Sequence, residues 1–340
     1  ALDTAKTNQY VGDKWDNSIL PTLQDYIRIP NQSPSFDPTN EHLADAVNLL
    51  FDWVEKQKVP GAKAEISCIE NRTPIILIDV PATKPTNAKT VLLYGHCDKQ
   101  PPLTEKWAPG LHPYTPVIRD GKLYGRGGAD DGYAVFAAIA SIQVLKEQNI
   151  PHDRYVIIIE ASEESGSPDL PYYIEHHKNE IGVPSLIVCL DSGCGNYDQF
   201  WMTSSLRGML VGDLRVDILN DGVHSGHASG IVASSFRIAR MLLERIEKLS
   251  DGSIVEDFHV RIPPAREEQA KYQAEVLGKE IYEEFPYVEG AQPVSHDLGH
   301  ILLNRAWRPA LSVTGADGFP TLQQAGNVLR PYTTLKLSLR

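Results

Sequence analysis

Two stretches of the sequence decide the fold: VLLYGHCD at residues 91–98 and KLYGRGGADDG at residues 122–132. The apolar run from Val91 to Tyr94 predicts a buried strand of a central sheet. His96 and Asp98 follow at the carboxyl end of this strand, where open α/β sheets place their functional side chains. Residues two apart on a strand point the same way, so Asp98 can lie beside His96 and accept its second imidazole N–H. The other ring nitrogen is then free for a metal.

Three further acidic groups follow predicted strands or a glycine-rich turn. They are Asp130 and Asp131 after GRGG, Glu163 and Glu164 after YVIIIEAS, and Asp191 at the end of SLIVCLD. One histidine and several carboxylates at successive strand ends are typical of a site for a hard to borderline divalent metal. Asp131 has a second interpretation, because an acid at the start of the helix predicted over residues 133–148 can serve as its N-cap.

Composition limits the classes of function. The chain has 340 residues, 42% of them hydrophobic, enough for one large core or two modest ones. No run of eighteen apolar residues exists, so we expect no membrane-spanning helix. The formal net charge of −12, without a basic stripe, argues against a nucleic-acid partner. Four cysteines are too few for a disulfide scaffold, which favours the cytoplasm, although a first residue that is not Met also fits a removed leader.

The composition shifts after Asp191, which divides the sequence into two parts. The first carries the apolar runs described above, with helices expected over residues 13–27 and 42–57. The second begins a new series of a strand and two helices, expected over residues 209–218, 233–249 and 266–284.

Six motifs in order, YGHCD, KLYGRGGADD, EASEESGS, VCLD, SSLRG and DGVHSG, resemble the dinuclear zinc exopeptidases. This family includes carnosinase, cytosolic nonspecific dipeptidase, aminoacylase and succinyl-diaminopimelate desuccinylase. The resemblance implies an α/β fold with a central mixed, mostly parallel sheet flanked by helices, and an inserted α+β lid. Residues 1–203 would be the catalytic zinc-hydrolase domain, without its C-terminal part. Residues 204–340 would be an incomplete lid that mediates homodimerisation.

The resemblance also implies a metal-binding role for four side chains. His96, Asp130, Glu164 and Asp191 would bind two zinc ions, with Asp130 bridging them. His96 and Asp191 would complete one site, and Glu164 with a histidine absent from this chain would complete the other. In the family, the peptide bond between the two aspartates of the Asp-Asp motif is cis.

Four further residues have roles implied by the resemblance. Glu163 would be the general base for a metal-bridging water, and Asp98 would orient the metal-binding histidine. His224 would reach the active site of a partner subunit and stabilise the oxyanion. Arg340 would bind a substrate carboxylate.

The chain departs from the family pattern at two places. Gly132 and Tyr133 stand where the family usually has Lys-Gly, and the sequence stops at LKLSLR, before the family's substrate loop and last metal-binding histidine. We therefore expect either a fragment or a chain that cannot complete its second metal site.

The implied function is metal-dependent hydrolysis of an amide bond in a dipeptide or at a peptide C-terminus. Gln100 and Pro101 after YGHCD resemble the dipeptidase and carboxypeptidase branch of the family. An N-acyl-amino-acid deacylase on the same scaffold, acting on acyl-amino-acid substrates, is one alternative. A truncated, non-catalytic peptide-binding relative is the other.

Overall fold

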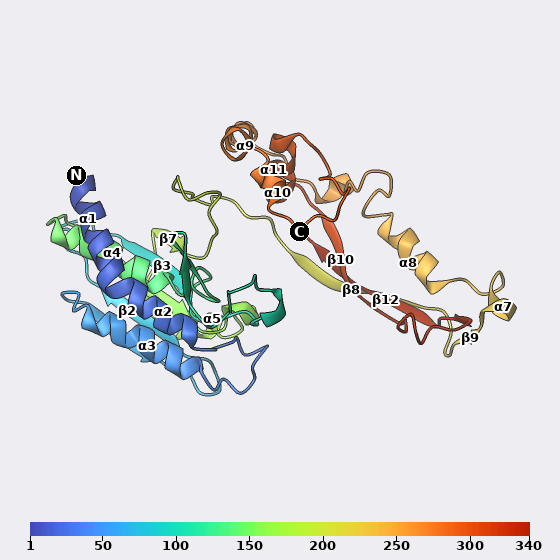
Figure 1. The fold of residues 1–340 in the computed structure, drawn as a ribbon, viewed down its shortest axis with the longest axis horizontal. Helices are drawn as coiled ribbons and strands as arrows, with labels where there is room; N and C mark the ends of the chain where they lie inside the picture. The colour runs from blue at the N-terminus through green and yellow to red at the C-terminus, as the bar shows by residue number, and fades with distance from the viewer. The chain divides into compact units, whose positions relative to one another are not determined.

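The computed structural model describes residues 1 to 340, which form two compact units, Ala1–Gly193 and Cys194–Arg340 (Figure 1). The sequence prediction placed the boundary after residue 203. Each unit has its own sheet and its own buried apolar clusters. None of the helices has the length and apolar character needed to cross a lipid bilayer.

A five-stranded mixed sheet, in the order β1-β2-β6-β3-β7, forms the centre of the first unit. Its strands are β1 (Lys63–Ser67), β2 (Ile75–Val80), β3 (Thr90–His96), β6 (Arg154–Glu160) and β7 (Leu186–Cys189). β6 and β7 pair in parallel with β3, whereas β2 pairs antiparallel with β1 and β6. The predicted mixed sheet is confirmed, and its parallel part consists of the three strands that carry the candidate site. Because these strands run in one direction, their carboxyl ends meet at one edge of the sheet.

Helices cover both faces of this sheet. They are α1 (Thr4–Lys14), α2 (Leu20–Arg28), α3 (Leu43–Lys56), α4 (Ala134–Glu147), α5 (Leu170–His176) and α6 (Lys178–Ile181), with a π-helical turn at Trp15–Ile19 between α1 and α2. Ile76 and Ile157 belong to the core that α2, α3 and α4 form on one face. Their neighbours Leu77 and Ile158 pack on the other face with Tyr173 of α5. This alternation follows from the two-residue period of a strand and explains why both faces are apolar.

The remaining elements of the first unit are short. They are the hairpin β4 (Val117–Arg119) and β5 (Lys122–Tyr124), and two 3-10 turns at Thr104–Lys106 and Glu163–Ser165. The second of these turns follows β6 and carries the adjacent glutamates that the sequence analysis singled out.

The second unit combines a small sheet with helices. Its strands are β8 (Leu210–Asp217), β9 (Val223–His224), β10 (Leu311–Asp317), β11 (Val328–Leu329) and β12 (Tyr332–Leu339). Its helices are α7 (Ser225–Ala228), α8 (Ser235–Leu243), α9 (Pro264–Leu277), α10 (Glu280–Glu283) and α11 (Leu298–Ala306), with a 3-10 turn at Glu256–Phe258. β12 pairs antiparallel between β10 and β8, and Ala239 of α8 packs against this sheet.

Two helices of the second unit are shorter than the sequence predicted. The helix expected over residues 233–249 ends at Leu243. The helix expected over residues 266–284 is divided at Gly278, whose φ of +57° ends α9 and is accessible to glycine at low cost.

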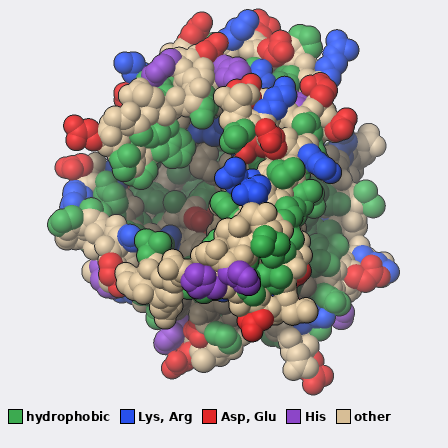
Figure 2. Space-filling model, turned by 90° about the vertical axis from the view of Figure 1, so that its right-hand side faces the viewer, with side chains coloured by type: hydrophobic (Ala, Val, Ile, Leu, Met, Phe, Trp, Pro, Cys, Tyr) green, Lys and Arg blue, Asp and Glu red, His purple; other side chains and the backbone are tan.

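On the face drawn in Figure 2, acidic and basic side chains are interspersed with apolar ones.

Candidate metal centre

The three parallel strands bring the candidate site residues to one edge of the sheet. β3 ends at His96, whose register partner on β6 is Glu160, and Tyr94 of β3 pairs with Cys189 of β7. The turn Glu163–Ser165 follows β6, and Asp191 follows β7. Side chains that are distant in the sequence are therefore adjacent in space.

Gly95 allows α4 to approach β3 closely. A Cβ atom at this position would lie 2.3 Å from the Cβ of Ala134, the first residue of α4, and 2.7 Å from Asp131 Oδ2. Because glycine has no side chain, Gly95 leaves room for the loop that carries the two adjacent aspartates.

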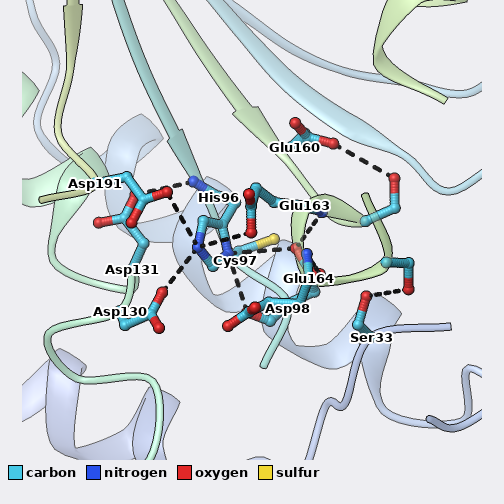
Figure 3. Close-up of polar contacts among 12 residues, drawn as sticks. Ser33, His96, Cys97, Asp98, Asp130, Asp131, Glu160, Glu163, Glu164 and Asp191 are labelled. Carbon is cyan, nitrogen blue, oxygen red and sulfur yellow. Dashed lines mark hydrogen bonds and ion pairs between the residues drawn. The ribbon is translucent and has the colours of Figure 1, made fainter. Parts of the chain in front are cut away.

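The five predicted side chains converge around one imidazole nitrogen, as Figure 3 shows. His96 Nε2 lies 3.0 Å from Asp130 Oδ1, 3.8 Å from Glu163 Oε2 and 3.9 Å from Asp191 Oδ2. Ligand atoms of His96, Glu163 and Asp191 all lie within 4.8 Å of one another. The same holds for His96, Asp130 and Glu164, so two overlapping groups share one histidine.

Asp98 lies beside His96, as the two-residue spacing predicted. His96 Nδ1 is 3.1 Å from the backbone oxygen of Asp98 and 3.4 Å from its Oδ1. The carboxylate of Asp98 also accepts hydrogen bonds from the backbone N–H groups of Glu163, at 3.1 Å, and Glu164, at 2.9 Å. One buried carboxylate therefore orients the histidine and fixes the turn that carries both glutamates.

The N-cap interpretation of Asp131 is wrong. The N-cap position of α4 is Tyr133, and no side chain caps this helix. Asp131 is buried, and its Oδ2 accepts a hydrogen bond of 3.1 Å from the backbone N–H of His96. The peptide bond between Asp130 and Asp131 is cis. Asp131 thus anchors the end of β3 rather than the start of the helix.

The pKa values in this cluster reflect burial and close carboxylates. Burial lowers the pKa of His96, but the hydrogen bonds with Asp130 and Asp98 outweigh it and raise the value to about 11. Burial raises the pKa of Asp131 to about 8 and that of Glu164 to about 7. It also raises the pKa of Glu163, and hydrogen bonding to His96 lowers that of Asp130.

The donor set fits divalent cations. Several carboxylates surround a single imidazole, and their negative charges repel one another unless cations neutralise them. Glu164 Oε1 and Asp131 Oδ1 are buried and have no hydrogen-bond partner. Gln100 donates a hydrogen bond to the other oxygen of Glu164. A bound cation would give the unpartnered Glu164 oxygen a partner.

Sequence reasoning missed several residues that support this site. Gln100 contacts Glu164, and the buried Glu160 accepts hydrogen bonds from Tyr94 Oη at 2.5 Å and Ser167 Oγ at 2.8 Å. The position of Glu160 at the end of an apolar strand was the available signal.

His224 and Arg340 belong to the second unit. His224 is exposed on β9, where it pairs with Val328 of β11. Arg340 follows β12, and its backbone N–H donates to Ala310 O at 2.9 Å. Their roles toward a substrate stay predictions.

Comparison with known proteins decides the family. Residues 92–325 match the model of Peptidase family M20/M25/M40. The chain belongs to this family. It is 30% identical to the Beta-Ala-His dipeptidase of Homo sapiens over 92% of this chain and 63% of that protein. It is 27% identical to the Cys-Gly metallodipeptidase DUG1 of Saccharomyces cerevisiae, over 74% of this chain and 53% of that one.

The fold agrees with this membership. The crystal structure of the M20 family metallo-carboxypeptidase Sso-CP2 from Sulfolobus solfataricus superposes with a TM-score of 0.70 at 20% identity. The superposition covers 94% of this chain and 70% of that one. The chain spans 63–65% of the length of the Beta-Ala-His dipeptidases that it matches. The predicted family and fold class are thus confirmed.

Proposed function

We propose that this protein hydrolyses the amide bond of a dipeptide, or the C-terminal bond of a short peptide, with two zinc ions. The observation that carries the proposal is the convergence of His96 with four carboxylates at the ends of parallel strands. Membership of the M20/M25/M40 peptidase family supports it, as does similarity to relatives named as dipeptidases.

In this proposal the metal ions would be held by His96, Asp130, Glu164 and Asp191. The distances from His96 Nε2 to Asp130 and Asp191, and the unpartnered oxygen of Glu164, support these roles. When bound, such metal ions would lower the pKa of a coordinated water toward about 7 and polarise the substrate carbonyl.

Glu163 acts as the general base in this proposal. Burial raises the pKa of its carboxyl, which brings a carboxylate closer to the pH at which it exchanges protons efficiently. Glu163 takes the proton of the attacking water and returns it to the nitrogen of the leaving amine. Asp98 keeps the histidine oriented and holds the backbone of Glu163 through a hydrogen bond of 3.1 Å.

The second unit supplies the remaining roles that we propose. It acts as the lid and homodimer interface, His224 stabilises the developing oxyanion in the partner subunit, and Arg340 binds the substrate carboxylate. The cytoplasm is the location we propose, on the small number of cysteines in the sequence.

The experiment that tests this function compares Glu163→Gln with the parent protein at equal zinc content. We expect dipeptide hydrolysis to fall by about 10²–10⁴-fold while zinc binding persists, because only the proton acceptor is lost. Glu175→Gln, at an exposed position of α5, is the matched control and should keep full activity. Loss of less than about tenfold in Glu163→Gln would contradict the assignment of the base.

The choice of substrate tests the reaction class. We expect faster turnover of dipeptides than of N-acetyl amino acids. The reverse order would identify a deacylase, and zinc binding without hydrolysis of either would identify a peptide-binding relative.

A further inference from the structure

Lys99 follows Asp98 in the chain, and its side chain is completely buried. Its ammonium donates hydrogen bonds to the carbonyl oxygens of Tyr26 at 2.7 Å, Ile27 at 3.4 Å and Ile29 at 2.6 Å. The same nitrogen lies 4.1 Å from the centroid of the Tyr26 ring. No step of the proposed reaction uses this lysine. Burying an ammonium is unfavourable unless its donors are satisfied, so this complete set of contacts points to a specific role.

The three carbonyl groups lie at the C-terminal end of α2 (Leu20–Arg28). The last carbonyl groups of a helix have no partner within the helix and carry a partial negative charge. A lysine ammonium has three donors and satisfies several of them at once. Lys99 therefore caps α2 from a loop about seventy residues further along the chain.

The same region of the chain holds the loop after β3 by other contacts. The backbone N–H of Lys99 donates to Asn31 O at 3.1 Å, and Ser33 N–H donates to Lys99 O at 2.9 Å. Tyr26 Oη and Asn31 Nδ2 both donate to the backbone oxygen of Cys97, at 2.8 and 2.5 Å. Residues 26–33 thus fix the backbone between His96 and Lys99 on both sides of Asp98.

Two other loops of the metal centre contact Lys99 or residues 26–33. A Cβ atom on Gly127 would lie 2.5 Å from Cε of Lys99, so the loop before Asp130 packs directly on the lysine stem. Gly127 O in turn accepts a hydrogen bond of 2.8 Å from the N–H of Gly132. Ser33 of this region, labelled in Figure 3, has its Oγ 2.5 Å from Oγ of Ser165, the last residue of the turn that carries Glu163 and Glu164.

We propose that Lys99 is a positioning residue of the metal centre: by binding the carbonyl end of α2 it holds the loops of His96 and Asp130 in their metal-binding arrangement. The inference rests on the proposed metal pair, but not on which bond the protein cleaves. Burial lowers the pKa of Lys99 to about 7.

The test measures zinc affinity, by competition with a chromophoric chelator, for the parent protein and for Lys99→Met. Methionine keeps the length of the stem and removes the ammonium. We expect zinc affinity to fall by about tenfold or more, the effect typical of residues that orient metal ligands. Lys146→Met is the matched control, because Lys146 Nζ donates to a backbone oxygen, that of Pro60, at 2.7 Å, and contacts none of the site residues. Its zinc affinity should stay within about twofold of the parent.

The outcomes separate this role from ordinary stabilisation. A Lys99→Met protein that melts at a lower temperature without metal, yet binds zinc with the parent affinity, would overturn the proposal. If Lys99→Met does not fold, Tyr26→Phe decides, since it removes only the hydroxyl group that bonds to Cys97 O. Weaker zinc binding supports the anchoring role of this region, and unchanged binding contradicts it. A parent protein that binds no zinc would contradict the proposed function itself.

Discussion

The carboxylate of Asp98 accepts a hydrogen bond of 2.9 Å from the backbone N–H of Glu164, although 66 residues separate them. The same carboxylate lies 3.4 Å from His96 Nδ1. Asp98 therefore links His96, at the end of β3, to the turn after β6 that carries Glu164, and each of its carboxylate oxygens has a partner.

The first prediction is that Asp98→Asn weakens zinc binding. The amide loses the negative charge and one of two acceptor oxygens, so either the imidazole or the glutamate turn is held less firmly. We expect zinc affinity to fall by about 10–100-fold, as for other groups that orient metal ligands. Competition with a chelator measures it. Asp45→Asn is the control, since Asp45 pairs with His42 at an exposed position, at 3.5 Å, and its loss should leave affinity unchanged.

The second prediction concerns Glu164→Gln without metal. Burial raises the pKa of this carboxyl to about 7, so the folded protein binds its proton more tightly than the unfolded chain does. The charged carboxylate therefore destabilises the metal-free fold, and this cost grows as the pH rises from about 4.5 to about 7. Glu164→Gln should raise the metal-free melting temperature by about 2 °C or more at pH 8, and less at pH 5.

Zinc should raise the melting temperature of Glu164→Gln less than that of the parent protein, because a proposed ligand is missing. Scanning calorimetry with and without zinc checks both parts of this prediction. An equal zinc-induced shift in the variant and the parent would contradict the role of Glu164 as a ligand.

The third prediction is that zinc binding releases protons. Without metal, the pKa of His96 is about 11 and that of Glu164 about 7, so both carry a proton at pH 6. A metal ligand must lose its proton, so we expect release of about two protons at pH 6 and about one at pH 9. Titration calorimetry in buffers of different ionisation enthalpy measures this number. Absence of proton release at pH 9 would contradict the prediction that zinc displaces a proton from His96.

The fourth prediction is that Gly95→Ala destabilises the first unit. The new methyl group would lie 2.3 Å from Ala134 Cβ, where β3 and α4 meet, and backbone must move to admit it. We expect a loss of about 1–3 kcal/mol in the free energy of unfolding, measured with urea on the metal-free protein. Gly12→Ala is the control, because it has open space within α1 and should be neutral or stabilising by up to about 1 kcal/mol.

Much of the fold was predictable because it depends on local patterns. The apolar run that begins at Val91 lies in β3. The acids that follow the neighbouring apolar runs lie just after the carboxyl ends of β6 and β7. The spacing of His96 and Asp98 gave their mutual orientation, since the period of a strand fixes it. The specific roles predicted for Asp130 and Glu163 near that histidine came from the resemblance to a family.

Other features depend on tertiary contacts that no local pattern reports. Asp131 bonds to the end of a strand 35 residues away instead of capping its own helix. Lysine is usually a surface residue, whereas Lys99 is buried where α2 packs against it. The division of the predicted helix at Gly278 shows that helical spacing can continue across a glycine that ends the helix.

The measurement that tests the central claim most directly is anomalous diffraction at the zinc edge from crystals of this protein grown with zinc. We expect two peaks about 3.5–4 Å apart, one beside His96 and Asp191, the other beside Glu164, and Asp130 between them. Zinc bound elsewhere, or an ordered protein whose His96 and Asp130 contact no metal, would contradict it.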